Sequence, residues 1–218
     1  MRQHASNHLL RLLATILVAG CIAIAGAKQG GGIQLSADKT SLAGGSTLTL
    51  TVTLGHPAGP GGLTVPIFSS DPGTIPNLSC HFAQNQTGTK LTVVPNAVTT
   101  RENVSLLAGL SSTTSGVTVA VVPPSLSTVR VSAPNVHAGG FFAFITLLDG
   151  FATPGGITVN LTSSAPNVIA LPSTGYIAAG LPYFLRFPTV NPVTQPTVVT
   201  FTASYNGVVK QCSVTVWP

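Results

Sequence analysis

Aliphatic and hydroxyl side chains alternate along several short stretches of this chain. Residues 47–54 alternate without a fault, with Leu or Val at the even positions and Thr at the odd ones. Residues 198–205 follow the same pattern, and 117–121 and 213–216 are shorter examples. Successive side chains on an extended strand point to opposite faces, so each stretch predicts a β-strand with one apolar and one hydroxyl face.

Glycine and proline separate these stretches. The chain contains 23 Gly and 17 Pro, and Asn206-Gly207 is typical of a two-residue hairpin turn in which both residues have positive φ. After residue 28 no segment keeps a helical apolar stripe for three turns. Short strands with turns about every 8–12 residues predict an all-β fold of antiparallel β-sandwiches.

Three motifs occur twice, 94 or 95 positions apart. Residues 43–45 (Ala-Gly-Gly) return at 138–140, residues 61–65 return at 155–159, and residues 69–72 return at 163–166. The repetition predicts two tandem sandwich domains, over 28–124 and 125–218. Pro123-Pro124-Ser125 is the expected junction, stiff because two prolines restrict the backbone.

The later parts of the two copies match less clearly. Val117-Thr118-Val119 pairs best with residues 198–200, at an offset near 81. This pairing predicts a net insertion of 13 residues in the first copy, in the polar, turn-rich segment 77–89.

The N-terminus has the pattern of a secretory leader. Arg2 and Arg11 precede an uninterrupted apolar or small stretch over 12–27, which is shorter than the roughly 20 residues of a comfortable membrane span. Cleavage after Ala27 predicts a signal peptide over 1–27. A second interpretation is a bacterial lipobox over 18–21, which would make Cys21 a lipidated N-terminus, although the residues after it stay apolar.

Charged side chains are scarce. The chain has nine Lys and Arg and four Asp and Glu, so 6% of its residues are charged, against about 25% in an average soluble protein. Scattered cations do not make a phosphate-tracking surface, so we expect no nucleic-acid partner. With 28 Thr and 19 Ser, hydroxyl groups are expected to cover the solvent faces of the strands.

A series of turn glycines and alternating core positions runs through the second copy, over 138–140, 154–159, 161–166, 178–180 and 199–208. This series resembles the immunoglobulin-like repeats of bacterial secreted and cell-surface proteins. The resemblance covers nearly all of 126–218 and is weaker over 33–124. It implies a β-sandwich fold and a role as a spacer, adhesive stalk or binding module without catalytic residues.

Groups that could perform chemistry are few after the leader. The four acids are spread over the repeats, and no nucleophile-elbow motif is present. Cys80-His81 is the one place where two soft metal ligands adjoin, but neighbours on a strand point to opposite sides. Cys80 and Cys212 fall in different repeats, which favours two thiols over an intradomain disulfide. We therefore expect no enzyme activity, no metal site and no cofactor.

Aromatic residues are the remaining side chains that could form a binding surface. Phe142 and Phe144 share one face of an extended segment, so Phe141 must lie on the other. An exposed surface using Phe141, Tyr183 and Trp217 could bind sugar rings or a neighbouring subunit. The alternative is that both faces are covered, one by the partner sheet and the other by the first domain.

These observations predict an exported, non-catalytic protein at the cell envelope or outside the cell, which acts through surface contacts as an adhesion or interaction module. One alternative is a self-assembling subunit of a surface layer or filament, for which low charge would help chains pack. Another is a glycan-binding or accessory module. The expected partners are a protein or glycan at the cell surface or further copies of the chain, and membrane attachment is expected only through the leader or a lipid anchor.

Overall fold

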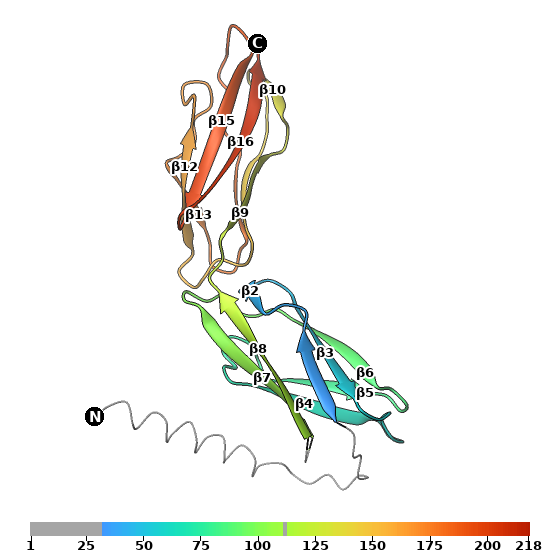
Figure 1. Cartoon of the computed structure of the whole chain (residues 1–218). Helices are drawn as coiled ribbons and strands as arrows, with labels where there is room; N and C mark the ends of the chain where they lie inside the picture. Colours follow the sequence, from blue (N-terminus) through green and yellow to red (C-terminus); the bar gives the residue numbers. More distant parts are fainter. Residues whose placement is uncertain (1–31, 111–112) are drawn as a thin grey trace, which may run out of the picture.

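The computed structural model describes residues 32–110 and 113–218, and all regular elements in these ranges are β-strands (Figure 1). No helix within the described ranges is long and apolar enough to cross a membrane. The predicted signal peptide and Cys21 lie outside the described residues. The strands form two sandwiches that lie end to end, with the C-terminus at the far end of the second (Figure 1).

The first sandwich contains a three-stranded and a five-stranded sheet. Their orders are β1-β3-β6 and β2-β8-β7-β4-β5. The short strand β2 pairs in parallel with β8, and the other pairs are antiparallel. The strands are β1 (Ile33–Ala37), β2 (Ser41–Ala43), β3 (Leu48–Leu54), β4 (Leu63–Ser69), β5 (Leu78–Phe82), β6 (Gly88–Val93), β7 (Glu102–Leu110) and β8 (Thr113–Val122).

The second sandwich repeats this arrangement strand by strand. Its sheets have the orders β9-β11-β14 and β10-β16-β15-β12-β13, and β10 pairs in parallel with β16. The strands are β9 (Leu126–Val131), β10 (Asn135–His137), β11 (Phe144–Leu148), β12 (Ile157–Ser163), β13 (Thr174–Ile177), β14 (Tyr183–Arg186), β15 (Thr197–Tyr205) and β16 (Val208–Trp217).

Alternation along the chain places each sandwich core. In β3 the side chains of Leu48, Leu50 and Val52 are fully buried, while the threonines between them face outward, as predicted. In the second core, the ring of Phe201 stacks on Phe142 and meets Phe144 edge-on at a centroid distance of 5.3 Å. The core residues of the first sandwich lie within 33–121 and those of the second within 126–216.

The two copies stay in register to their last strands, so the predicted insertion at 77–89 is wrong. This segment forms β5 and the start of β6, whose counterparts are β13 and β14. Ser105 and Thr118 share a hydroxyl hydrogen bond of 3.0 Å, and Thr200 and Ser213, 95 positions later, share the same one. Alternating Val and Thr recur in several strands, and for this reason sequence comparison matched β8 to β15 instead of β16.

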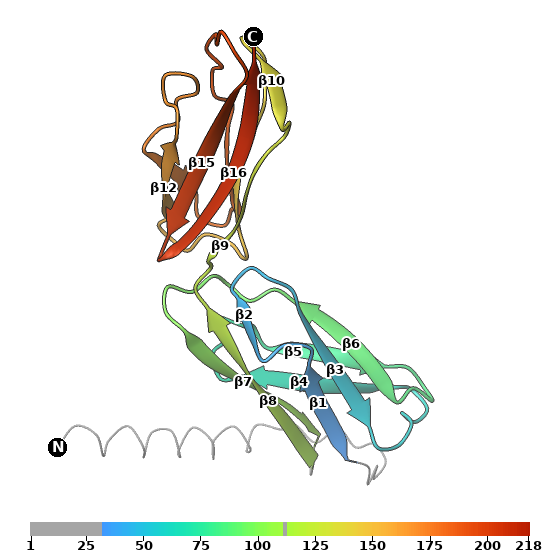
Figure 2. The same ribbon diagram turned by 45° about the horizontal axis from the view of Figure 1, so that its top comes forward.

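The two sandwiches meet at a short junction around residues 123–125 (Figure 2). The Phe151 amide donates to the Gly44 carbonyl at 2.9 Å, and the Ser46 hydroxyl donates to the Asp149 carbonyl. A Cβ on Gly150 would overlap the same Gly44 carbonyl, so glycine is required for this approach. These hydrogen bonds join the two sandwiches through backbone groups and the Ser46 hydroxyl.

Candidate functional site

The three aromatic residues predicted as a contact surface are all exposed, Phe141 at 90%, Tyr183 at 44% and Trp217 at 43%. The prediction that Phe141 and Phe142 point to opposite sides is confirmed, since Phe142 is buried, and the alternative that Phe141 is covered is wrong. The three residues do not share one surface. Tyr183 lies in the β9-β11-β14 sheet, Trp217 in the opposite sheet, and Phe141 in the loop between β10 and β11.

Tyr183 belongs to an apolar outer sheet face, which we call the β14 face. It consists of the outward side chains of β11 and β14, and we include Phe187, which is 64% exposed and continues the alternation of Tyr183 and Leu185 one step past β14. Tyr183 pairs with Leu147, and Leu185 pairs with Ile145 in the next outward row. The β14 face is therefore formed by Ile145, Leu147, Tyr183, Leu185 and Phe187.

The same positions of the first sandwich are polar or lack a side chain. Strand register places Thr51 beside Lys90 and Thr53 beside Gly88, where the second sandwich has the two apolar pairs. Thr92 takes the place of Phe187. Both copies build the same strands, so neither fold nor core packing requires apolar residues at these outward positions. Exposed apolar patches are typical of contact surfaces, and the first sandwich has no such patch at these positions.

A cation borders the β14 face on the side of β9. Arg130 pairs with Ile145 in the same outward row and is exposed. Residues 126–218 contain one acid, Asp149, and its carboxylate accepts from the Ser125 amide at 2.7 Å in the junction. Across each row the face therefore runs from a polar or cationic edge on β9, over an aliphatic centre on β11, to an apolar edge on β14.

The acids of the chain each hold neighbouring backbone or hydroxyl groups. Asp38 accepts from the Thr49 amide at 2.8 Å, and Glu102 accepts from the Thr100 hydroxyl at 2.9 Å. Asp71 accepts from the amides of a tight turn, and its hydrogen bonds, with the Thr74 side chain first, lower its pKa. Within residues 32–110 and 113–218, each of these carboxylates has its own separate hydrogen-bond partners.

The predicted separation of Cys80 and His81 is confirmed. Cys80 is buried in the first core and donates to the Val65 carbonyl at 3.8 Å, while His81 is exposed and contacts the Thr64 hydroxyl. Over 32–110 and 113–218, no three His, Cys, Asp or Glu side chains gather closely enough to hold a metal ion.

Both described cysteines are free thiols in separate sandwiches. Burial raises the pKa of Cys212 to about 11, and burial also raises the pKa of Cys80 above its ordinary value of 9.0. Cys212 packs against the second core. The prediction of two thiols instead of an intradomain disulfide is confirmed, and neither residue presents a reactive thiolate near neutral pH.

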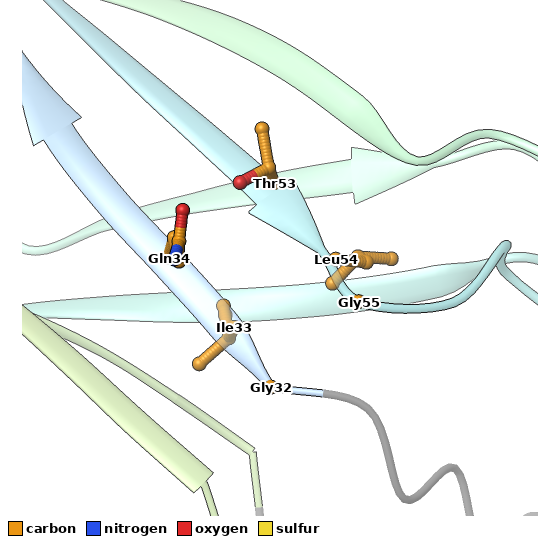
Figure 3. A pocket seen from close by; sticks show the side chains of 6 residues that line it. All are labelled: Gly32, Ile33, Gln34, Thr53, Leu54 and Gly55. Atoms are coloured by element: carbon orange, nitrogen blue, oxygen red, sulfur yellow. The ribbon is translucent and has the colours of Figure 1, made fainter.

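A shallow open depression lies at the free end of the first sandwich, between the start of β1 and the end of β3 (Figure 3). Gln34 and Thr53 pair across it and point to one side of the sheet. Its lining has no titratable side chain and consists of Gly32, Ile33, Gln34, Thr53, Leu54 and Gly55. A depression with this lining offers no group for catalysis.

Sequence reasoning found Tyr183 but missed the rest of the β14 face. The strands that contain Ile145, Leu147 and Leu185 carry apolar residues on both faces, so no hydrophobic–polar alternation marks these positions. The available signal was the internal repeat. Aligned with the first copy at the correct offset, these positions change from Thr or Lys to Ile or Leu.

The fold defines an all-β protein of two immunoglobulin-like sandwiches. No protein-family model matches the sequence, and no curated protein matches it. Among solved structures, the chain is similar to the adhesin InvE of Yersinia pseudotuberculosis, at 16% identity and a TM-score of 0.36, over 88% of this chain and 61% of that chain. The chain thus spans less than two thirds of InvE.

Two further structures show similar values. For bovine butyrophilin the identity is 9% and the TM-score 0.34, over 87% of this chain and 100% of that chain. For the BSP domain of a biofilm-associated protein the identity is 16% and the TM-score 0.28, over 85% of this chain and 29% of that chain. Such values concern the fold alone, and we infer function from the residues of this chain.

Proposed function

We propose that this protein is exported and acts without catalysis, as a module that contacts other molecules at the cell envelope or outside the cell. The observation that carries the proposal is the β14 face, an exposed apolar surface on a strand framework whose other copy is polar at the same positions. Burial of apolar surface is the dominant favourable contribution in most protein associations.

The arrangement of polar groups supports a non-catalytic role. Each of the four acids of the chain is engaged with a neighbouring amide or hydroxyl group. Hydrolytic or acid–base chemistry needs titratable groups brought together around a substrate. Export is supported by the leader pattern of residues 1–27 and by strand faces on which hydroxyl groups replace charges.

The chemistry of the β14 face favours an apolar partner surface over a free sugar. Tyr183 and Phe187 offer rings, but Ile145, Leu147 and Leu185 lie between and beside them and carry no hydrogen-bonding groups. Sugar recognition combines ring stacking with several polar contacts, whereas aliphatic side chains pack best against other apolar side chains. A protein surface is therefore the class of partner that we propose, with a glycan as the competing class.

The proposal is tested by retention on cells. Fluorescently labelled protein is applied to washed producing cells, and the bound amount is measured. It is compared with that of the triple variant Ile145→Thr, Leu147→Thr, Leu185→Lys, in which each change introduces the residue of the first copy. We expect a loss of at least tenfold in retention, with no loss for the control Val198→Lys, which changes an exposed residue of the opposite sheet. Equal retention of all three proteins would reject the β14 face.

A further inference from the structure

We propose that the partner of the β14 face is a second copy of this chain, bound sheet to sheet in a twofold-symmetric dimer. This inference rests on the proposed function, because it names the occupant of the same face. It follows from the order of the three strands, from the placement of charge along the rows and from the size of the face.

The strand order makes the face self-complementary. In the order β9-β11-β14, a twofold axis parallel to the central strand lays β11 of one copy on β11 of the other and β9 of each copy on β14 of its partner. Isologous interfaces require this match of a patch with itself. Aligned packing of two sheets brings such faces to about 10 Å apart, with the side chains interdigitating.

The rows then match in chemistry as well as in position. One row reads Arg130, Ile145, Leu185 and the next Thr128, Leu147, Tyr183. In the proposed pairing the aliphatic centre meets itself and each row meets itself, so Arg130 of each copy lies opposite the partner's Leu185 and Thr128 lies opposite the partner's Tyr183. The aliphatic stem of Arg130 then packs along Leu185, and its guanidinium group extends toward the Tyr183 ring in the next row, where a cation–π contact is favourable. The two copies of Arg130 lie on opposite sides of the axis, so the like charges are kept apart.

The first sandwich lacks the side chains that the proposed pairing needs. Its corresponding rows read Ser36, Thr51, Lys90 and Gln34, Thr53, Gly88, which offer no apolar centre and no ring for a cation. Pairing therefore involves the second sandwich alone. The chain closes into a dimer instead of growing into an open filament, because each copy has one such face among its described sheets.

The size of the face sets the expected affinity. Three strands about 4.8 Å apart and about five residues long give a face of roughly 15 by 17 Å. Two such faces bury less than the roughly 1,200 Å² of a standard stable interface, which corresponds to a weak and reversible dimer. We expect dissociation in the micromolar to millimolar range at neutral pH.

Sedimentation velocity of the exported protein, from about 1 μM to 1 mM, tests the inference. We expect the weight-average mass to rise from that of one chain toward that of two, and Leu185→Lys to weaken association at least tenfold. The control Val198→Lys, an equally exposed apolar-to-lysine change on the opposite sheet, should leave association unchanged. A monomer at all concentrations, or association that Leu185→Lys does not weaken, would overturn the dimer.

A cross-linking experiment tests the orientation. Cys80 and Cys212 are first replaced by Ala. One batch of this protein then carries Thr128→Cys and another carries Tyr183→Cys, and a bismaleimide with a spacer of about 10 Å is added. The proposed axis predicts cross-links in the mixture of the two batches and few in either batch alone. Efficient cross-linking of the Thr128→Cys batch to itself would overturn the arrangement. If the wild-type chain stays monomeric yet is retained on cells through the β14 face, the dimer fails and the proposed function stands.

Discussion

Thr146 is one of the core residues at which the two copies differ. Its side chain is fully buried, and its hydroxyl oxygen has no hydrogen-bond partner among the residues that the structure describes. The first copy has Val52 at the same position, also fully buried. A buried hydroxyl group without a partner keeps its desolvation penalty, which valine of nearly the same shape does not have.

We therefore expect Thr146→Val to stabilise the second sandwich by about 1 kcal/mol. The measurement is calorimetric unfolding of the full chain, followed in the transition that Phe201→Leu also shifts. Val52→Thr in the first sandwich is the matched control, and it should destabilise by a similar or larger amount. Unchanged stability in Thr146→Val would mean that the hydroxyl group is satisfied in solution.

Cys212 gives a prediction about pH. Its pKa is raised by burial from 9.0 to about 11, so the neutral thiol is the form that the fold favours. A group whose pKa is higher in the folded chain contributes stability below the unfolded pKa, and this contribution is lost as pH rises from 9.0 to about 11. We expect alkylation of native Cys212 to be slow at pH 8 and to accelerate with each pH unit up to about 11. A rate that levels off near pH 9 would show an ordinary exposed thiol.

At the scale of single elements, the β15–β16 hairpin shows how local sequence determines structure. Asn206 has a φ of 48° and Gly207 a φ of 80°, as the Asn-Gly pair predicts. A Cβ on Gly207 would meet no atom within 4 Å, so only the backbone conformation restricts this position. We expect Gly207→Val to destabilise the second sandwich by about 1–2 kcal/mol in urea unfolding, because a side chain is disfavoured at positive φ.

The control for this hairpin prediction is Asn206→Gly, which places a residue without a Cβ at the neighbouring positive φ. It should change the free energy of unfolding by less than about 0.5 kcal/mol. If Gly207→Val and Asn206→Gly unfold at the same urea concentration, the turn conformation does not contribute to stability.

The strands show how far sequence reasoning reaches and where it stops. Alternation located β3 and β15 because burial on one face imposes a period of two. The same alternation is shared by many strands, so it could not decide which strand of one copy corresponds to which strand of the other. Tyr183 was found because aromatic residues are rare, whereas Leu185 was missed because its outward direction depends on strand pairing with Ile145.

At the scale of the whole molecule, the junction determines where the β14 face can reach. Gly150 lies against the backbone of the first sandwich, where a Cβ would overlap the Gly44 carbonyl and come within 3.0 Å of the Ala43 side chain. We expect Gly150→Ala to break the hydrogen bond from the Phe151 amide and to let the two sandwiches tumble more independently. The measurement is the rotational correlation time of each sandwich from ¹⁵N relaxation at dilute concentration.

The wild-type chain should give one common correlation time for both sandwiches, and Gly150→Ala should give a shorter time for each. Gly88→Ala is the control, since its Cβ would make an ordinary contact of 3.8 Å with Thr53. The same correlation times in all three proteins would mean that the junction tolerates the added methyl group.

The central claim is that the β14 face is the surface that the protein uses for contact, and hydroxyl-radical footprinting tests it most directly. Modification of four exposed rings, Phe141, Tyr183, Phe187 and Trp217, is measured by mass spectrometry in dilute purified protein and in protein on its producing cells. We predict that Tyr183 and Phe187 become at least threefold less reactive on cells, while Phe141 and Trp217 keep their reactivity. Equal reactivity of all four rings in both states, or protection of Trp217 instead of Tyr183, would contradict the claim.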